Sequence, residues 1–442
     1  MADKLAIAGG RPIVDTKTIK SWPVITQADR DAVLKVLDSG IVGGGTAPEA
    51  VALEKEWAQY CGSKYCLTTN SGTAALHMAL AAVGIGPGDE VITSAFTFLA
   101  SASCALHQNA VPRFVDIDPR TYTMDPAKLE AAINERTKAI IPVHIQGIPA
   151  DMDEILAIAK KHNIPVIEDA CQAHGATYKG KKVGTMGLMG AFSLNCLKNL
   201  CGGEGGLLIT DDEFCIKKAS LVRMFGDEID DERQVRVYNA SILGWMYRNQ
   251  ELPAAFARAQ LKRLDDFNAT RAKNSEYLSK AFAEIPGIIP PYVPEDRTHV
   301  YWFYIIRLDP KAAGLDVEPR RFREAVEKAV FKEGIPIGQW QTMPVPAQDL
   351  FQTKYGYAKT GFPWNYNEDL SKITYNPDDY PESQKLCEDY TVVHGTHPPN
   401  DTDLMAKYVE AFRKVFSNLD VVMDHADDDI QAGFDPAMYG AA

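Results

Sequence analysis

The sequence predicts an α/β protein, with a mainly parallel sheet that carries helices on both faces and a smaller α+β domain after it. Two observations predict this class. From about residue 63 onward, short β-rich runs alternate with stretches of helical periodicity, and strand–helix–strand repetition builds parallel sheets with right-handed crossovers. Most of the predicted strands are continuous in Val, Ile and Phe, as expected of strands buried on both faces.

The predicted elements follow in chain order. Strands are predicted at residues 89–96, 110–118, 137–147, 163–170 and 205–214, and amphipathic helices at 125–137 and 151–163. Asp125 followed by Pro126 is typical of an N-cap and a first helical residue. Residues 258–282 predict a long, charged connector helix, and the apolar run at 299–308 opens the α+β portion.

These elements predict four parts of the chain. They are an N-terminal segment, 1–62, that packs on the large domain; the large domain with its connector helix, 63–282; a small domain, 283–420; and an acidic tail, 421–442. The length of 442 residues fits one large core plus a smaller one. The sequence has no internal repeat at a fixed period, so a repeat architecture is not predicted.

Charge and composition exclude several classes of function. The formal net charge is −13 and no cluster of Lys and Arg interrupts it, so the basic face that nucleic-acid binding needs is not expected. No apolar run reaches the length of a membrane span, and the N-terminal apolar stretch is too short for a signal peptide. The eight cysteines form no CxxC pair, which indicates reduced thiols and a cytoplasmic protein.

Two motifs have plain structural interpretations. "GATYKGKK", residues 175–182, is one residue short of a phosphate-binding P-loop, because lysine stands where a hydroxyl is needed for magnesium. We favour a surface turn there. "HGTH", residues 394–397, offers two metal ligands, but no third ligand stands at a supporting spacing. We therefore predict no metal site, and a loop that shapes a pocket.

Three stretches carry candidate chemistry, and the first is "TTNSGTAALHMAL" at residues 68–80. A polar turn runs directly into an Ala- and Leu-rich helix. The free N–H groups at such a helix start bind anions, and Gly72 lets a phosphate approach closely. A plain N-cap by Ser71 or Thr73 explains the same residues equally well.

The second stretch is "VIEDACQAHGA", residues 166–176, in which a buried apolar strand ends on Glu168 and Asp169. Carboxylates at the carboxyl end of a strand in an α/β sheet lie where ligands bind. A buried carboxylate at this position needs a cationic partner. The alternative interpretation is a solvated strand end.

The third stretch, "FSLNCLKNLCGGEGG" at residues 192–206, places Lys198 between an apolar run and four glycines. Apolar flanks desolvate the amine and lower its pKa from about 10.4 toward a nucleophilic range. Ser193 can offer a hydroxyl to an anion, and the alternative is an ordinary lysine whose amine reaches solvent. A phosphate cradle, a buried carboxylate and a desolvated lysine are the parts that a pyridoxal phosphate enzyme needs.

In this combination the sequence resembles the DegT/DnrJ/StrS-type sugar aminotransferase family, within the fold type I pyridoxal phosphate enzymes. The similarity extends from about Trp22 to about Phe416 and includes "NSGTAAL", "GPGDEVITSAFTFLAS", "VPRFVDID", "IIPVHIQGIPADMD" and "VIEDACQAHGATYKGKKVG". It implies a fold type I aminotransferase-like sheet of the seven-stranded type and a homodimer with its active site at the subunit interface. It also implies a role in aminosugar or aminocyclitol biosynthesis, including that of antibiotics.

The resemblance implies roles for single residues. Lys198 would be the Schiff-base lysine and proton shuttle, and Asp169 would hold the pyridine nitrogen of pyridoxal 5′-phosphate protonated. Gln172 would lie near the phenolic oxygen of the cofactor, and Phe98 would stack on its ring. The remaining cofactor-binding residues form the phosphate cradle: Ser71, Gly72, Thr73 and Ser193.

One implied contact departs from the family pattern. Many members carry "GYNYR" on a loop from the partner subunit, and its asparagine touches the phosphate. Here the stretch is "LGWMYRNQ", which places Met246 at that position. Methionine donates no hydrogen bond, so we expect Arg248 or Asn249 to bind the phosphate instead.

The implied reaction moves an amino group from L-glutamate or L-glutamine to a keto-sugar or keto-cyclitol. Kinetics would be ping-pong, with pyridoxamine 5′-phosphate as the intermediate form. The unusual segments 339–351 and 391–401 and the start "LAIAGGRP" favour a keto-cyclitol. A dehydratase or cyclising relative on the same fold is the alternative, although dehydratases tend to replace the lysine with histidine. A non-catalytic regulator would be expected to lose Lys198 or Asp169, or to gain a basic segment, and neither is seen.

Overall fold

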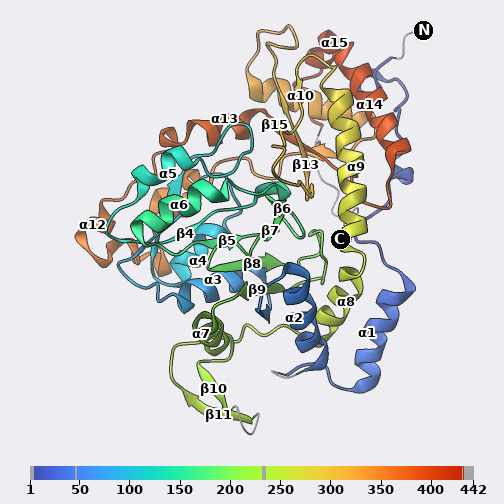
Figure 1. Ribbon diagram of the computed structural model, residues 1–442. Coiled ribbons are helices and arrows are strands. Elements are labelled where there is room, and N and C mark those ends of the chain that lie inside the picture. Colours follow the sequence, from blue (N-terminus) through green and yellow to red (C-terminus); the bar gives the residue numbers. More distant parts are fainter. Residues whose placement is uncertain (1–3, 45–46, 231–234, 431, 433–442) are drawn as a thin grey trace.

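A seven-stranded sheet forms the centre of the large domain in the computed structural model, which describes residues 4–44, 47–230, 235–430 and 432 (Figure 1). The strands are β1 (Tyr65–Thr69), β2 (Glu90–Ser94), β3 (Val111–Val115), β4 (Thr137–Ile141), β5 (Ile167–Asp169), β8 (Met189–Ser193) and β9 (Gly206–Thr210). Their spatial order is β3-β2-β4-β5-β8-β9-β1, and single parallel bridges join β4 to β5. β9 is antiparallel to both neighbours and the other pairs are parallel. The predicted mainly parallel sheet is confirmed.

Helices cover both faces of this sheet because successive side chains of a strand point to opposite faces. On β9, Leu208 packs in one core cluster with α3 (Gly72–Ala82), α4 (Ala100–His107) and α7 (Glu213–Arg223). Leu207 and Ile209 pack on the opposite face with α2 (Pro48–Cys61) and α8 (Glu251–Leu261). Two further helices, α5 (Pro126–Ala132) and α6 (Met152–His162), cover β2 to β4.

The smaller domain is a four-stranded antiparallel sheet with helices packed against it. Its strands are β12 (Ile288–Ile289), β13 (Tyr304–Leu308), β15 (Tyr390–Val393) and β14 (Ile337–Gly338), in that spatial order. The packed helices are α9 (Leu264–Phe282), α10 (Pro319–Lys332) and α14 (Thr402–Phe416). Within the part of the chain that the structure describes, every helix is too short or too polar to cross a membrane.

Helix boundaries differ from the sequence prediction at two places. The predicted connector at 258–282 is two helices, α8 and α9, with a break at residues 262–263. The helix predicted at 125–137 starts as expected, with the Asp125 carboxylate accepting the Ala127 N–H at 2.9 Å, but ends at Ala132. After Ala132 the chain forms a local turn, in which the Asn134 side-chain oxygen accepts the Arg136 N–H at 2.8 Å and the Asn134 carbonyl accepts the Thr137 N–H at 3.0 Å.

Part of the N-terminal segment packs on the small domain, where we had expected the large one. Leu5, Val14 and Ile19 belong to the core of the small domain. The buried Glu333 carboxylate fixes this stretch by accepting the Ala6 N–H at 2.8 Å. Farther along, α1 (Gln27–Ser39) packs on α8.

The acidic C-terminal segment begins as a helix. This helix, α15 (Leu419–Asp424), packs on α10, and Val422 is buried in the core of the small domain. Residues 431 and 433–442 of the predicted tail lie outside the described residues.

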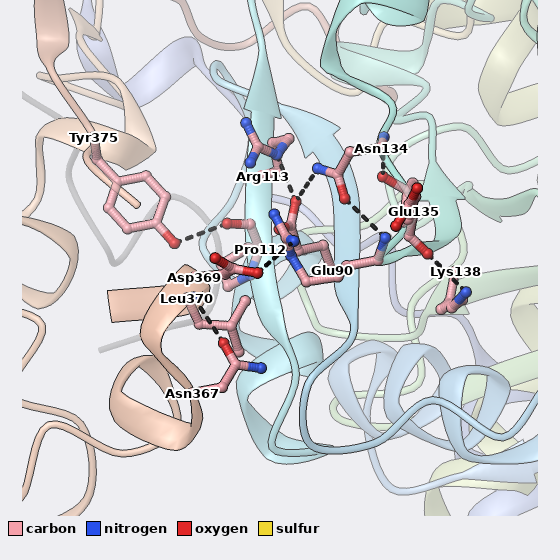
Figure 2. A network of polar contacts seen from close by, with 12 residues as sticks. Glu90, Pro112, Arg113, Asn134, Glu135, Lys138, Asn367, Asp369, Leu370 and Tyr375 are labelled. Atoms are coloured by element: carbon pink, nitrogen blue, oxygen red, sulfur yellow. Dashed lines mark hydrogen bonds and ion pairs between the residues drawn. The ribbon is translucent and has the colours of Figure 1, made fainter. Parts of the chain in front are cut away.

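Residues 341–380, which we call the strap, run from the small domain back over the β3 edge of the large sheet. The strap carries α11 (Asp349–Thr353) and α12 (Glu368–Ser371), and Figure 1 shows α12 at the far side of the large domain. Its aromatic residues Phe351 and Tyr375 meet Phe114 edge-on. The Tyr375 hydroxyl donates to the Pro112 carbonyl at 2.8 Å (Figure 2). The strap therefore fastens the two domains together.

A buried carboxylate organises the polar side of this contact. Glu90, fully buried at the start of β2, accepts hydrogen bonds from Arg113 Nε at 2.6 Å and Asn134 Nδ2 at 2.8 Å. It also accepts one from Arg136 Nε at 2.8 Å, and Arg136 in turn reaches Asp369 on α12 at 3.3 Å. Figure 2 shows Glu90 in the middle of this network, with Asp369 on one side and Asn134 on the other. Burial alone raises the pKa of Glu90, but the hydrogen bonds from Arg113, Asn134 and Arg136 outweigh it and hold that pKa below its usual value.

We expect Glu90→Gln to lower the stability of the protein by about 2 kcal/mol at pH 7, less than for a fully buried ion pair because both arginines are partly exposed. A lowered folded-state pKa contributes stability above the unfolded pKa of about 4.3, and this stability is lost as pH falls through the folded value. The gap between wild type and variant should therefore begin to narrow as pH falls below about 4.3 and close only below the folded-state pKa of Glu90. Thermal unfolding at pH 7 and at a series of lower pH values measures this gap, with Glu284→Gln in the exposed Arg413 pair as the control. A stability difference between wild type and variant that stays constant with pH would contradict this prediction.

Candidate active site

The residues predicted to carry the chemistry meet at one edge of the sheet. β1 ends at Thr69, β5 at Asp169 and β8 at Ser193, and these three strands run in the same direction. The carboxyl ends of parallel strands are where α/β proteins bind ligands. The turn before α3, the Asp169 carboxylate and the loop that carries Lys198 therefore share this edge.

Gly72, the first residue of α3, approaches the ends of β5 and β8 more closely than any residue with a side chain could. A Cβ atom at this position would lie 2.7 Å from Cys171 Sγ and 2.9 Å from Ser193 Cβ. The helix start is thus pressed against both strand ends. The missing side chain permits this approach, which brings the N–H groups of the first turn to the ends of both strands.

Capping and anion binding both fit the first turn of α3. The Ser71 hydroxyl accepts the Ala74 N–H at 3.1 Å, so Ser71 is an N-cap. The Gly72 and Thr73 N–H groups precede the first intrahelical hydrogen bond and can still bind an anion. Ser193 lies beside them; its hydroxyl accepts the Asn195 N–H at 3.3 Å, which leaves its own hydrogen to donate.

The Asp169 carboxylate is buried and is held on both oxygens. Oδ2 accepts the Ser101 hydroxyl at 2.6 Å, and Oδ1 accepts the Cys171 N–H at 3.1 Å. Thr97 Oγ1 lies 2.8 Å from Ser101 Oγ, and it must donate, because the Ser101 hydrogen is committed to Asp169. This chain of two hydroxyls fixes the direction in which the carboxylate points.

The neighbouring Glu168 has a structural role. Its side chain is fully buried and accepts three backbone N–H groups of residues 184–187, each at 2.6 Å. The fourth donor is His144 Nε2 at 3.0 Å, and His144 Nδ1 accepts the Ala150 N–H. This tautomer is neutral, so hydrogen bonds balance the burial of Glu168 without the cationic partner that the sequence suggested.

Two tryptophans fasten the loop that carries Lys198. Trp22 Nε1 donates to the Lys198 carbonyl at 3.2 Å, and Trp302 Nε1 donates to the Leu197 carbonyl at 2.8 Å. The Lys198 amine lies 3.4 Å from the centroid of the Trp302 ring. The loop that carries Lys198 is therefore held from the N-terminal segment and from the start of the small domain.

Desolvation lowers the pKa of Lys198 to about 8, although Cys171 and Asp169 nearby favour the charged form. An exposed lysine has a pKa of about 10.4. The neutral, nucleophilic amine is thus far more populated near neutral pH than it would be in water. The sequence-based expectation of a desolvated amine agrees with this environment.

Gln172 and the loop after β4 connect the site to the small domain. Gln172 Oε1 accepts the Gln146 N–H at 2.7 Å, which leaves the Nε2 group to donate to a ligand. A Cβ at Gly147 would lie 2.8 Å from Val300 Cγ2 and 3.2 Å from the Gln172 carbonyl. This loop is therefore wedged between the end of β5 and the first residues of the small domain.

Phe98 presents an open aromatic face. Its side chain is 51% exposed and stacks on Trp340, with ring centroids 6.3 Å apart and 21° between the planes. Trp340 in turn meets Trp302 edge-on at 5.3 Å. Phe98 follows β2, whereas both tryptophans come from the small domain, so the aromatic wall of the site is shared between domains.

Residues 246–249 lie beside the turn that leads into α3 of the same chain. The Met246 carbonyl accepts Asn70 Nδ2 at 3.3 Å, and the Tyr247 carbonyl accepts the Asn70 N–H at 2.8 Å. Asn249 is buried, and its Nδ2 lacks a hydrogen-bond partner among the described residues. The segment thus borders the cradle: Arg248 is partly exposed and the Met246 side chain is 45% exposed.

Sequence reasoning did not single out Ser101, Thr97 or Trp302. The first two left a signal, because they are the polar residues of the otherwise apolar stretch "AFTFLAS". Trp302 left no such signal in the sequence, because it is far from Lys198 along the chain and only folding brings the two residues together.

The two motifs with plain interpretations are parts of the scaffold. Residues within 175–182 form a two-stranded hairpin, β6 (Thr177–Tyr178) with β7 (Lys181–Lys182). In "HGTH", His394 packs edge-on against Phe303, and His397 lies against Trp22. Burial lowers the pKa of both histidines to about 3, so the two rings are neutral at pH 7.

Comparison with known proteins gives the class of enzyme. A family model described as the DegT/DnrJ/EryC1/StrS aminotransferase family matches residues 23–384. The crystal structure of S. venezuelae DesV in complex with a ketimine intermediate has a TM-score of 0.76 and 28% identity, covering 88% of this chain and 94% of that one. The fold is that of an aminotransferase of fold type I.

The chain belongs to the DegT/DnrJ/EryC1/StrS aminotransferase family. GDP-perosamine synthase of Caulobacter vibrioides is 42% identical over 287 residues, which are 65% of this chain and 76% of that protein. L-Glutamine:2-deoxy-scyllo-inosose aminotransferase of Streptomyces lividus is 39% identical over 319 residues, 70% of this chain and 75% of that protein.

Membership implies the use of pyridoxal phosphate, and the residues at this edge fit that group. Gly72 lets the first turn of α3 approach Cys171 and Ser193 closely, and the N–H groups of such a helix start suit a phosphate. The buried, doubly hydrogen-bonded Asp169 suits a cationic ring nitrogen. Lys198 supplies a desolvated amine for an aldehyde.

We expect Gly72→Ala to weaken the binding of pyridoxal phosphate about tenfold or more, because the added methyl group clashes with Cys171 and Ser193. Titration of the cofactor-free protein, followed by visible absorbance, measures the affinity. Gly86→Ala is the matched control, because a Cβ there meets no atom within 4 Å. Equal affinity in wild type and both variants would show that the cradle is elsewhere.

Proposed function

We propose that this aminotransferase uses pyridoxal phosphate to move an amino group from L-glutamine or L-glutamate to a keto-cyclitol. The observation that carries the proposal is the meeting of Lys198, Asp169 and the Gly72 cradle at one edge of the sheet. Intact Lys198 and Asp169 favour transamination over a non-catalytic regulator on the same scaffold. Lys198 also disfavours the dehydratase alternative, whose members tend to carry histidine at this position.

The bound cofactor supplies an electron sink for the bond that breaks at the donor Cα. Asp169 would pair with the ring nitrogen and keep it protonated, and the hydroxyls of Ser101 and Thr97 hold the carboxylate in that direction. Gln172 Nε2, which the contact with Gln146 leaves available, would donate to the phenolic oxygen. The half-exposed face of Phe98 would cover the ring.

Lys198 is the group that moves protons. With a pKa of about 8, its amine is available as a base near neutral pH. It takes the proton from the donor Cα in the first half-reaction. In the second half-reaction the same amine delivers a proton to the acceptor carbon. Because the product of the donor leaves before the acceptor binds, the kinetics would be ping-pong.

The acceptor class rests on sequence and relatives. The inosose aminotransferase relative supports a cyclitol acceptor and L-glutamine as donor, as do the "LAIAGGRP" start and the unusual segments at 339–351 and 391–401. The GDP-perosamine synthase relative makes a nucleotide-linked keto-sugar the second candidate. Aminocyclitol or aminosugar biosynthesis, including that of antibiotics, is the corresponding pathway.

A homodimer is supported by the projecting hairpin of β10 (Asp227–Asp230) and β11 (Val235–Ala240), which Figure 1 shows extending away from the body. Exposed apolar residues lie on it and on the segments just before and after it: Phe225, Val237, Tyr238, Leu243 and Met246. Such patches mark contacts with other proteins. Because this segment leads to residues 246–249 beside the cradle, a partner there would border the active site, with Arg248 and Asn249 as the candidate phosphate contacts.

The visible absorbance of the loaded enzyme tests the proposed reaction. We expect excess L-glutamine or L-glutamate to bleach it, and a keto-cyclitol to restore it. Restoration only by a nucleotide-linked keto-sugar would select the second acceptor class. Lys198→Ala should lose bleaching by a factor of at least about 10³ in rate, because no other base occupies that position.

Two outcomes would contradict this proposal. Bleaching that no keto acceptor reverses would argue against transamination to a ring ketone. A Lys198→Ala variant with wild-type turnover would remove the role given to the lysine. Lys182→Ala, whose amine lies over the Tyr60 ring away from the site, serves as the matched control and should bleach normally.

We expect Leu243→Asp to weaken the dimer about tenfold or more, because a carboxylate replaces a side chain that is 75% exposed in the single chain and would be buried between subunits. Sedimentation equilibrium measures the association. Phe214→Asp, at an equally open position on α7, is the control and should leave the dimer intact. A monomeric wild type would refute the proposed dimer.

A further inference from the structure

Trp302 contacts the catalytic lysine at two points. Its indole Nε1 donates to the Leu197 carbonyl at 2.8 Å, and the Lys198 Nζ lies 3.4 Å from the centroid of its ring. An ammonium within about 6 Å of an indole centroid is attracted to the ring face. One side chain therefore contacts both the backbone of the lysine loop and the lysine amine.

The Trp302 ring is a fixed surface. The side chain is only 3% exposed, and its backbone N–H donates to the Gln146 carbonyl at 2.9 Å. Phe303 stacks on it with centroids 4.0 Å apart, and Trp340 meets it edge-on at 5.3 Å. Because the backbone of Trp302 and its indole are both held by these contacts, the indole stays in place. Contact between the two therefore depends on where the Lys198 side chain lies.

We propose that Trp302 is a positioning residue for Lys198, whose ring face holds the lysine amine whenever that amine is not bonded to the cofactor. The inference rests on the proposed function, in which the amine is released and rebound in every cycle. A released lysine side chain has four flexible methylene groups and can adopt many rotamers. A fixed cation-binding face beside Asp169 and Cys171 keeps the amine within reach of the reacting carbon.

The test follows Lys198 itself in the full-length protein freed of cofactor. Cyanate carbamylates the neutral form of an amine, so the rate at Lys198 against pH, read by peptide mass spectrometry, gives its titration midpoint. Exposed Lys35 in the same digest is the internal reference. The titratable groups that face the amine are the same in every variant: Asp169, Cys171, His174, Cys196 and Glu204.

We expect a wild-type midpoint near pH 8 and a fall of about one pH unit in Trp302→Leu, because the ammonium loses its contact with the ring. Trp302→Phe keeps a weaker ring face and should fall about half as far. Trp364→Leu removes a buried indole from the strap, away from the site, and should leave the midpoint unchanged. That control separates loss of the ring from loss of packing.

An unchanged or higher midpoint in Trp302→Leu would overturn the proposal. If that variant does not fold, Trp302→Phe decides in its place, and a wild-type midpoint there overturns the proposal equally. The measurement uses neither donor nor acceptor. It can therefore fail while the bleaching experiment succeeds, or succeed while that experiment fails, which separates the role of Trp302 from the proposed reaction.

Discussion

The site depends on the close approach of α3 to the ends of β5 and β8. Only glycine fits at position 72, where a Cβ would fall inside the contact distance of Cys171 and Ser193. This approach brings the N–H groups of a helix start against two strand ends of a parallel sheet. The cradle, the Asp169 carboxylate and the lysine loop share one edge for that reason, and each would be an ordinary structural feature without it.

Burial sets the chemistry of the groups gathered there. Glu168 and Asp169 are adjacent and both buried, yet their environments differ. Glu168 is saturated by backbone donors and a neutral histidine, so it holds the end of the strand. Asp169 is held by one hydroxyl and one backbone N–H, which leaves room for a ligand. The same exclusion of water lowers the pKa of Lys198.

The small domain completes the site and is fastened to the large domain by the strap. Residues 299–303 press on the loop after β4, where Gly147 has no room for a side chain. On the other side of the sheet, strap residues pack on β3, and Arg136 links Glu90 to α12. Trp302 and Trp340 therefore lie at defined positions beside Lys198 and Phe98. A loosely attached small domain would not hold them there.

The sequence by itself determined the parallel sheet, the glycine of the cradle, the acidic strand end and the lysine before the glycines. These are local patterns, because periodicity, turn residues and apolar flanks act over a few positions. Folding alone decided that Ser101 binds Asp169, that residues 5–19 cover the small domain, and that Trp302 lies on Lys198. Each of these contacts joins residues distant along the chain, and no local pattern records which distant side chain will fill a given space.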